Sequence, residues 1–140
     1  MPIVNSFPVV REINLTPEYL QKFESRVAEE YEAGGIKGPV HLSDGNEEQL
    51  IDIFSRVSDR DFVFSAWRNH YHALLHGIDE AFLFDEIRAG RSMGIMCDRP
   101  AFFSSSIVGG IIPIALGVAL GLSQDTANDA RVWGFIGDMT

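Results

Sequence analysis

The chain has 140 residues, of which 46% are hydrophobic and 22% are charged, and its formal net charge is −9. That composition is typical of one folded domain and argues against disorder. Eleven basic residues against twenty acidic ones count against a protein that tracks a nucleic-acid backbone, and the single cysteine excludes a disulfide framework.

The sequence favours a cytoplasmic protein without a membrane-spanning segment. The lone Cys97 fits a reducing compartment, and residues 1–11 lack the basic start and long apolar run of a targeting peptide. The longest apolar stretch, residues 107–122, contains four glycines and one proline and is shorter than the ~20 residues that cross a bilayer. We expect it to form a buried helix.

Residues 1–15 are predicted to form an extended lead-in, and a single domain is expected over residues 16–140. Thr16 followed by Pro17 is typical of a helix start, and apolar side chains recur at steps of three and four along the segment that follows. Gly34 is expected to end this helix, because glycine readily adopts the left-handed conformation found at helix ends.

A second helix and then a strand are predicted next. Asp44 and Glu47 have the spacing of a capping box, and the apolar side chains after them again recur at helical intervals. Phe62–Phe64 is a short apolar run of strand-forming residues bounded by charged ones, which predicts a buried strand.

The second half of the chain predicts more helices and one further strand. Helical patterns continue through Leu75 and again over residues 79–89, and an irregular stretch follows at residues 91–100. Residues 131–136 predict an apolar strand that ends at Gly137. Because apolar strands alternate with helices, we predict an α/β fold with a parallel sheet flanked by helices.

The dipeptide Gly137-Asp138 directly follows the last predicted strand. In open parallel sheets, ligands bind beyond the carboxyl ends of the strands. A glycine there lets the backbone approach a phosphate, and an aspartate offers a hard oxygen ligand to Mg²⁺. A common surface turn is the other interpretation of this dipeptide.

A second candidate site lies just after the first predicted strand. Arg68 can bind a phosphate oxygen through charge-assisted hydrogen bonds, and Trp67 offers a flat apolar wall. His70 and His72 can donate hydrogen bonds or move protons near neutral pH. A surface turn with Arg68 paired to an acid is the alternative. His72 and His76 also have the spacing of two metal ligands, but no nearby acid completes a zinc site.

A third candidate is the loop from Ser104 to Gly110, before the glycine-containing helix. Its backbone amides and carbonyls are free to bond a heterocycle. Helix capping by Ser106 is the simpler interpretation, and the two are compatible.

Together these signals form a more specific pattern. From about Glu18 to Asp138, the chain resembles the thiamine-diphosphate-binding domain of the alpha subunit of 2-oxo acid dehydrogenases, the family of the pyruvate dehydrogenase first component. The family's His-Leu-x-x-Gly-Gln-Glu element is similar to residues 41–47, with Asn46 in place of glutamine. Its Tyr-Arg-x-His element is similar to the four residues that begin at Trp67, where tryptophan replaces tyrosine.

The later motifs continue the resemblance. Residues 106–113 are similar to the loop that precedes the family's glycine-rich helix, and the helix matches at Pro113 and Gly117. Gly137-Asp138 matches the opening of the family's Gly-Asp-Gly motif.

The resemblance implies a site for thiamine diphosphate and magnesium. The cofactor-binding residues that it implies are Trp67, Arg68, Ser106, Val108, Gly137, Asp138 and Met139. The first two would contact the diphosphate, and the two in the loop would hold the aminopyrimidine ring. Asp138 would also be the magnesium ligand, and His70 would line the site as its catalytic residue.

Two departures from the family pattern affect the expected site. Met139 stands where the motif has its second glycine, which alters the approach to the diphosphate. The sequence ends before the family's closing asparagine, so the resemblance implies a fold that is incomplete at the C-terminus and lacks one protein ligand of magnesium. The glutamate that activates the aminopyrimidine in this family belongs to the beta subunit.

The resemblance implies part of an enzyme that decarboxylates a 2-oxo acid. We expect an oligomer in which this chain works with a complementary chain, either beta-subunit-like or the remainder of the domain. Two alternatives stay open: carbon–carbon transfer of the transketolase type, and a truncated or split relative that acts as a non-catalytic binding or assembly module. Neither a nucleic acid nor a membrane is expected as a partner.

Overall fold

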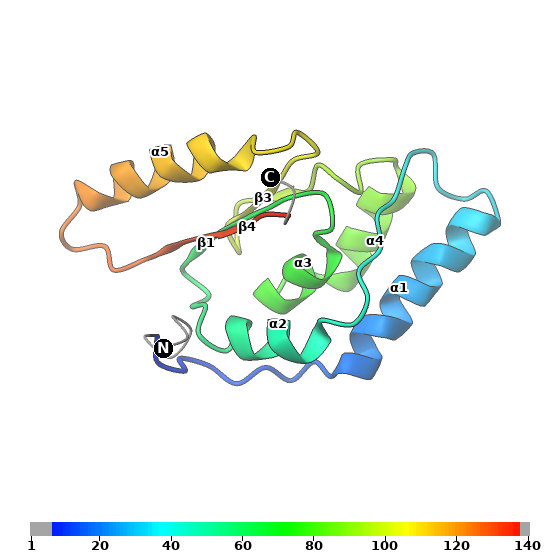
Figure 1. Ribbon diagram of the computed structural model, residues 1–140, viewed down its shortest axis with the longest axis horizontal. Coiled ribbons are helices and arrows are strands. Elements are labelled where there is room, and N and C mark those ends of the chain that lie inside the picture. The colour runs from blue at the N-terminus through cyan, green and yellow to red at the C-terminus, as the bar shows by residue number, and fades with distance from the viewer. Residues whose placement is uncertain (1–6, 138–140) are drawn as a thin grey trace.

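The computed structural model describes residues 7–137 of the chain. This part forms five helices and four strands (Figure 1). The helices are α1 (Pro17–Glu32), α2 (Glu47–Phe54), α3 (His70–His76), α4 (Glu80–Arg88) and α5 (Ile111–Ser123), and the strands are β1 (Phe62–Ser65), β2 (Met96–Cys97), β3 (Phe102–Ser104) and β4 (Val132–Phe135).

The four strands form one sheet in the order β2-β3-β1-β4. β1 pairs in parallel with both β3 and β4, whereas β2 runs antiparallel to β3 at one edge. The predicted α/β fold with flanking helices is therefore confirmed, with a mixed rather than a wholly parallel sheet. The antiparallel edge comes from residues 91–100, where the sequence predicted irregular structure and Cys97 pairs with Phe102.

Helices lie on both sides of the sheet, but they contribute unequally to the core. In Figure 1, α5 lies above the sheet and α1 to α4 lie on the other side. The apolar core forms on the side of α1 to α4. Its fully buried side chains include Leu20, Val27, Phe54, Val57, Val63, Leu83, Ile87 and Ile95. The C-terminal ends of β1 and β4 therefore rest on a packed layer of helices.

α1 begins where the sequence predicts it. Oγ1 of Thr16 accepts a hydrogen bond of 3.2 Å from the backbone N–H of Tyr19, which satisfies one of the free donors of the first turn. The helix ends at Glu32, and Gly34 follows with a φ of 77°. That left-handed conformation favours glycine, which is why the chain can turn away from the helix here.

The capping box predicted for α2 is wrong. Asn46 is the N-cap residue, and its side chain makes no capping hydrogen bond. The carboxylate of Glu47 instead accepts hydrogen bonds from the backbone N–H of Gly45, at 3.1 Å, and from the hydroxyl of Tyr71, at 3.0 Å. These contacts hold the side chain of Glu47, the first residue of α2, in the interior of the protein. It therefore does not form the capping box with Asp44.

α5 differs most from its prediction. It begins at Ile111 with Gly110 as its N-cap, so Ser106 lies outside the helix and does not cap it. Ile111 is its one buried residue, whereas Leu116 and Leu120 are each 59% exposed. The expectation of a buried helix is therefore wrong for residues 7–137, because α5 packs on β4 and β1 with one side only. In the same residues, no helix has the length and apolar character needed to span a membrane.

Candidate functional site

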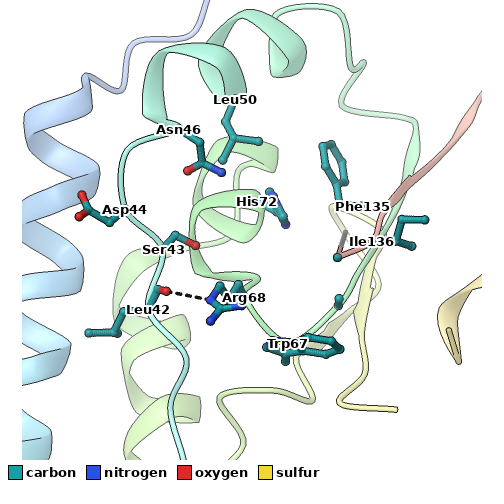
Figure 2. A pocket seen from close by; sticks show the side chains of 12 residues that line it. Leu42, Ser43, Asp44, Asn46, Leu50, Trp67, Arg68, His72, Phe135 and Ile136 are labelled. Carbon is teal, nitrogen blue, oxygen red and sulfur yellow. Dashed lines mark hydrogen bonds between the residues drawn. The ribbon is translucent and has the colours of Figure 1, made fainter. Parts of the chain in front are cut away.

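A pocket of about 490 Å³ lies at the carboxyl ends of β1 and β4 (Figure 2). We call it the β1–β4 pocket. It is lined by residues of segments 42–46, 66–68 and 135–137, together with Leu50 of α2 and His72 of α3. The carboxyl end of a parallel sheet is where ligands bind in open α/β folds, so this is the candidate site.

Trp67 and Arg68 both line the β1–β4 pocket, as the sequence predicted for a binding site. Nε of Arg68 donates a hydrogen bond of 3.2 Å to the backbone carbonyl of Leu42, across the pocket wall. Within residues 7–137, no carboxylate lies within 4.0 Å of its guanidinium. The alternative of a surface arginine paired to an acid therefore does not describe this part of the chain.

Gly137 also lines the pocket, directly after the strand end at Phe135 and Ile136. The two segments that the sequence suggested for a site, one after β1 and one after β4, thus line the same pocket. Asp138, the predicted magnesium ligand, and Met139 lie outside the described residues.

His72 is a pocket residue for which the sequence suggested hydrogen bonding or proton transfer, but it is not among the residues that the family resemblance implies. Its Nδ1 lies 2.7 Å from Oγ of Ser65, and its ring stacks on Phe135 with a centroid separation of 4.3 Å. Burial, with a smaller contribution from the charge of His70, lowers the pKa of His72 to about 3. His72 is therefore neutral at physiological pH, which does not fit the predicted ability to move protons there.

His70 lies beneath the pocket rather than in it. It is completely buried, with Nδ1 3.1 Å and 3.2 Å from the two carboxylate oxygens of Glu24 and Nε2 2.8 Å from Oγ of Ser92. The same carboxylate accepts a hydrogen bond of 3.3 Å from the backbone N–H of Ser43, a residue of the pocket wall. A catalytic role for His70 stays a prediction, and the observed contacts are those of a positioning residue.

A second buried carboxylate holds the same wall. Glu47 binds the N–H of Gly45 and the hydroxyl of Tyr71, and that hydroxyl lies 3.3 Å from the carbonyl oxygen of Ser43. Burial raises the pKa of Glu47, but hydrogen bonds from its own backbone, Gly45 and Tyr71 outweigh burial and lower the pKa overall. Glu47 is thus a charged anchor for the wall.

Sequence reasoning missed the anchoring role of Glu24. The available signal is its spacing, since it lies four residues after Leu20 and three before Val27 on the buried stripe of α1. A carboxylate on an apolar stripe needs a polar partner in the core, because burying an unpaired charge is costly.

The predicted aminopyrimidine residues are not part of this pocket. Ser106 and Val108 lie in the loop between β3 and α5, both exposed, and Val108 is 60% exposed. Their role in holding a ring stays a prediction.

Residues 7–137 contain no group of three or more histidine, cysteine, aspartate or glutamate side chains placed to hold a metal ion. His72 and His76 have the sequence spacing of two metal ligands. Nε2 of His76, however, lies 3.1 Å from the backbone carbonyl oxygen of Asp61 in the core.

Comparisons with known proteins identify one family. Residues 16–139 match the family described as "Dehydrogenase E1 component". The alpha subunit of the pyruvate dehydrogenase E1 component from Zymomonas mobilis is 30% identical over 112 residues, which cover 71% of this chain and 31% of that protein. The alpha subunit of acetoin:2,6-dichlorophenolindophenol oxidoreductase from Bacillus subtilis is 30% identical over 129 residues, which cover 85% of this chain and 38% of that protein.

The corresponding alpha subunit of pyruvate dehydrogenase E1 from Porphyra purpurea is 29% identical over 140 residues, covering 85% of this chain and 39% of that protein. The chain thus spans between 31% and 39% of the length of these three relatives. Because the family match covers nearly the whole chain, the protein belongs to the dehydrogenase E1 component family and is similar to its alpha subunits.

Proposed function

We propose that this chain is part of a thiamine-diphosphate-dependent enzyme and that the β1–β4 pocket binds the diphosphate of that cofactor. The observation that carries the proposal is the arrangement of Arg68. Its guanidinium lines the pocket at the end of β1, without a carboxylate partner among residues 7–137, and Gly137 lines the same pocket after β4. A guanidinium fork beside a glycine backbone suits phosphate oxygens.

The pocket residues fit such a group. The volume of about 490 Å³ lies in the range of small-molecule sites, roughly 300–1,000 Å³. Nε of Arg68 is engaged by Leu42, so the other guanidinium N–H groups are the ones available to a phosphate. Trp67 supplies an apolar wall that would exclude water from one side of the ligand.

When bound, thiamine diphosphate supplies the carbon nucleophile that attacks a carbonyl carbon of the substrate. Arg68 would hold the diphosphate, and Gly137 would let the backbone approach it. Asp138 is proposed as a ligand of magnesium, and Met139 as a backbone donor to the diphosphate. The exposed loop after β3 is proposed to bind the aminopyrimidine through Ser106 and Val108.

We infer a 2-oxo acid as the substrate class. Two of the relatives described above are named for pyruvate dehydrogenase, which acts on such an acid. An acetoin-type hydroxyketone is the second candidate, because the relative from Bacillus subtilis is named as an acetoin oxidoreductase. Both classes present a carbonyl carbon to the cofactor.

We also infer that activity requires a complementary chain of the beta-subunit type. The relatives are named as alpha subunits, and α5 exposes a row of apolar side chains that includes Ile112, Leu116 and Leu120. Apolar surface of this kind is commonly covered in assemblies. Sedimentation velocity at micromolar concentration should show a complex when such a partner is added. A sharply monomeric chain in its presence contradicts the inference.

The reaction itself is tested by dye reduction. The chain, a beta-type partner, thiamine diphosphate and magnesium are mixed with pyruvate or with acetoin, and reduction of 2,6-dichlorophenolindophenol is followed by absorbance. The proposal predicts reduction with one of these substrates that disappears when this chain is left out. Cofactor binding without dye reduction from either substrate would favour the non-catalytic alternative.

A further inference from the structure

Arg68 is not the only polar side chain that the β1–β4 pocket offers to a ligand. His72 lines the same pocket four residues later in the chain, and Figure 2 shows its ring between Leu50 and Phe135. Neither the expected diphosphate contacts nor the predicted catalytic residue includes it. Its two ring nitrogens have different surroundings, and that difference carries the inference.

Nδ1 of His72 is engaged from below by the hydroxyl of Ser65, at 2.7 Å. Nε2 of His72 makes no hydrogen bond with any of residues 7–137. Three buried side-chain atoms in that part of the chain lack a hydrogen-bond partner, and Nε2 of His72 is not among them. Those three atoms belong to Arg56, Asn69 and His76. Nδ1 is therefore occupied within residues 7–137, and Nε2 is the ring nitrogen left for a ligand in the pocket that His72 lines.

Burial keeps the ring neutral, and its aromatic neighbours fix its plane. Phe135 stacks on His72 at an interplanar angle of 25°, and Phe54 stacks on it at 19° with a centroid separation of 6.1 Å. A neutral imidazole carries one N–H, and the partner of one nitrogen decides which nitrogen bears it. If the hydroxyl of Ser65 donates to Nδ1, the proton resides on Nε2.

We propose that His72 is a ligand-binding residue of the β1–β4 pocket, which donates a hydrogen bond from Nε2 to a phosphate oxygen while Ser65 holds Nδ1 as an acceptor. Phosphate oxygens only accept hydrogen bonds, so a bound diphosphate selects this tautomer. The inference rests on the proposed function, since it adds a second donor to the site where Arg68 binds the diphosphate.

The short contact between Ser65 and His72 has another possible meaning, that of a nucleophile and its base. Ser65 is completely buried, so its hydroxyl is not accessible to a substrate. The pair is therefore a support for the imidazole and not a nucleophilic dyad.

The test measures affinity by calorimetry for three ligands: inorganic pyrophosphate, thiamine diphosphate with Mg²⁺, and thiamine. His72→Phe keeps an aromatic ring in the stack and removes both nitrogens. It should weaken binding of the first two ligands about tenfold or more, because a hydrogen bond to a charged group is lost. Binding of thiamine, which has no phosphate, should not change, and thermal melts check that the variant is folded.

A spectroscopic measurement on the wild-type chain tests the tautomer directly. In ¹⁵N spectra of the pyrophosphate complex, His72 should be protonated at Nε2 and not at Nδ1. Ser65→Ala should reduce the population of that tautomer, whereas Ser123→Ala, on the far end of α5, should leave it unchanged. Protonation at Nδ1 in the complex overturns the inference.

The outcomes separate this inference from the proposed function. If thiamine diphosphate binds equally well to wild type and His72→Phe, the role of His72 is wrong and the proposed function stands. If pyrophosphate binding depends on His72 but thiamine diphosphate binds no more tightly than pyrophosphate, the role stands and the cofactor assignment is wrong. Failure of the wild-type chain to bind either phosphate ligand, both alone and mixed with a beta-type partner, overturns both.

Discussion

Arg68 is the side chain on which the diphosphate proposal depends most. Arg68→Ala should lower the affinity for thiamine diphosphate about tenfold or more, because charge-assisted hydrogen bonds to phosphate are among the strongest single contacts available. Arg68→Lys keeps the charge but loses the planar guanidinium. The affinity of this variant for thiamine diphosphate should therefore lie between those of the wild type and Arg68→Ala.

Stability should change little in both variants, since Arg68 is exposed and its side chain makes one hydrogen bond within residues 7–137, to Leu42. Isothermal calorimetry gives the affinities, and a thermal melt of each variant serves as the control. Equal affinity in wild type and Arg68→Ala shows that the diphosphate does not bind here.

Asp61 is a second residue with a specific expected effect, on stability rather than on binding. Its buried carboxylate accepts hydrogen bonds of 2.8–2.9 Å from the N–H of Ser58, the N–H of Arg131 and the indole N–H of Trp133. It thereby joins the starts of β1 and β4, the two strands that carry the site.

Asp61→Ala leaves these donors unpaired and should cost about 3 kcal/mol of unfolding free energy, because each unsatisfied buried group costs roughly 1–3 kcal/mol. Urea denaturation measures the loss. Asp129→Ala, at the surface ion pair with Arg60, is the control and should cost under about 1 kcal/mol. Equal stabilities of the two variants would contradict this assignment.

At the scale of elements, α1 and α2 hold the loop that forms one wall of the pocket. Glu24 of α1 binds the N–H of Ser43 and the ring of His70, and Glu47 of α2 binds the N–H of Gly45. These contacts connect the loop to the start of α3, directly after Arg68. The hydrogen bonds of these two buried carboxylates thus connect the loop wall to the segment that carries Arg68.

Glu24→Ala should therefore change both stability and pocket geometry. It leaves Nδ1 of the buried His70 without its carboxylate partner and should cost about 3 kcal/mol of unfolding free energy. It should also speed hydrogen exchange at the amide of Ser43. Glu29→Ala, at an exposed position of the same helix, should have neither effect. Unchanged exchange at Ser43 in Glu24→Ala would show that the carboxylate does not hold the wall.

The elements with strong local signals are the ones that the sequence predicts. Thr16 and Pro17 define the start of α1, and the apolar run at Phe62–Phe64 predicts β1, because capping and strand propensity act over a few residues. The positions of Trp67 and Arg68 at a strand end follow from that prediction and are correct. Their detailed contacts, such as the bond from Arg68 to Leu42, require the folded chain.

Features that depend on distant neighbours were missed or predicted wrongly. β2 has two residues and exists through its pairing with Phe102 and Phe103, so no local pattern identifies it. The position of Glu47, the first residue of α2, depends on its hydrogen bond with Tyr71, which lies 24 residues away in the chain. Apolar composition predicts that α5 is a helix. It does not specify how much of the surface of this helix is covered by the rest of residues 7–137.

For the whole molecule, two histidines predict sensitivity to acid. Burial lowers the pKa of His72 from 6.5 to about 3 and, together with the charge of Arg11, lowers that of His76 from 6.5 to about 4. The unfolded chain binds protons below pH 6.5, whereas the folded chain keeps both rings neutral. Their contribution to stability is therefore full above pH 6.5 and is lost as the pH falls, towards about 4 for His76 and about 3 for His72.

The expected slope approaches about 1.4 kcal/mol per pH unit for each histidine in that window. Urea denaturation at about pH 7 and about pH 5 measures it, at values where most carboxylates remain ionised. His76→Asn should reduce the slope, because one of the two protons is then no longer taken up on unfolding. A stability that is constant between these pH values contradicts the lowered pKa values of the two histidines.

The central claim for this chain is that its pocket binds thiamine diphosphate, and calorimetric titration tests it most directly. The cofactor with Mg²⁺ is titrated into the chain alone and into its mixture with a beta-type partner, with Arg68→Ala as the matched variant. We predict saturable binding, in the mixture if not in the chain alone, that weakens about tenfold or more in Arg68→Ala. The absence of binding under both conditions, or binding that does not depend on Arg68, would contradict the claim.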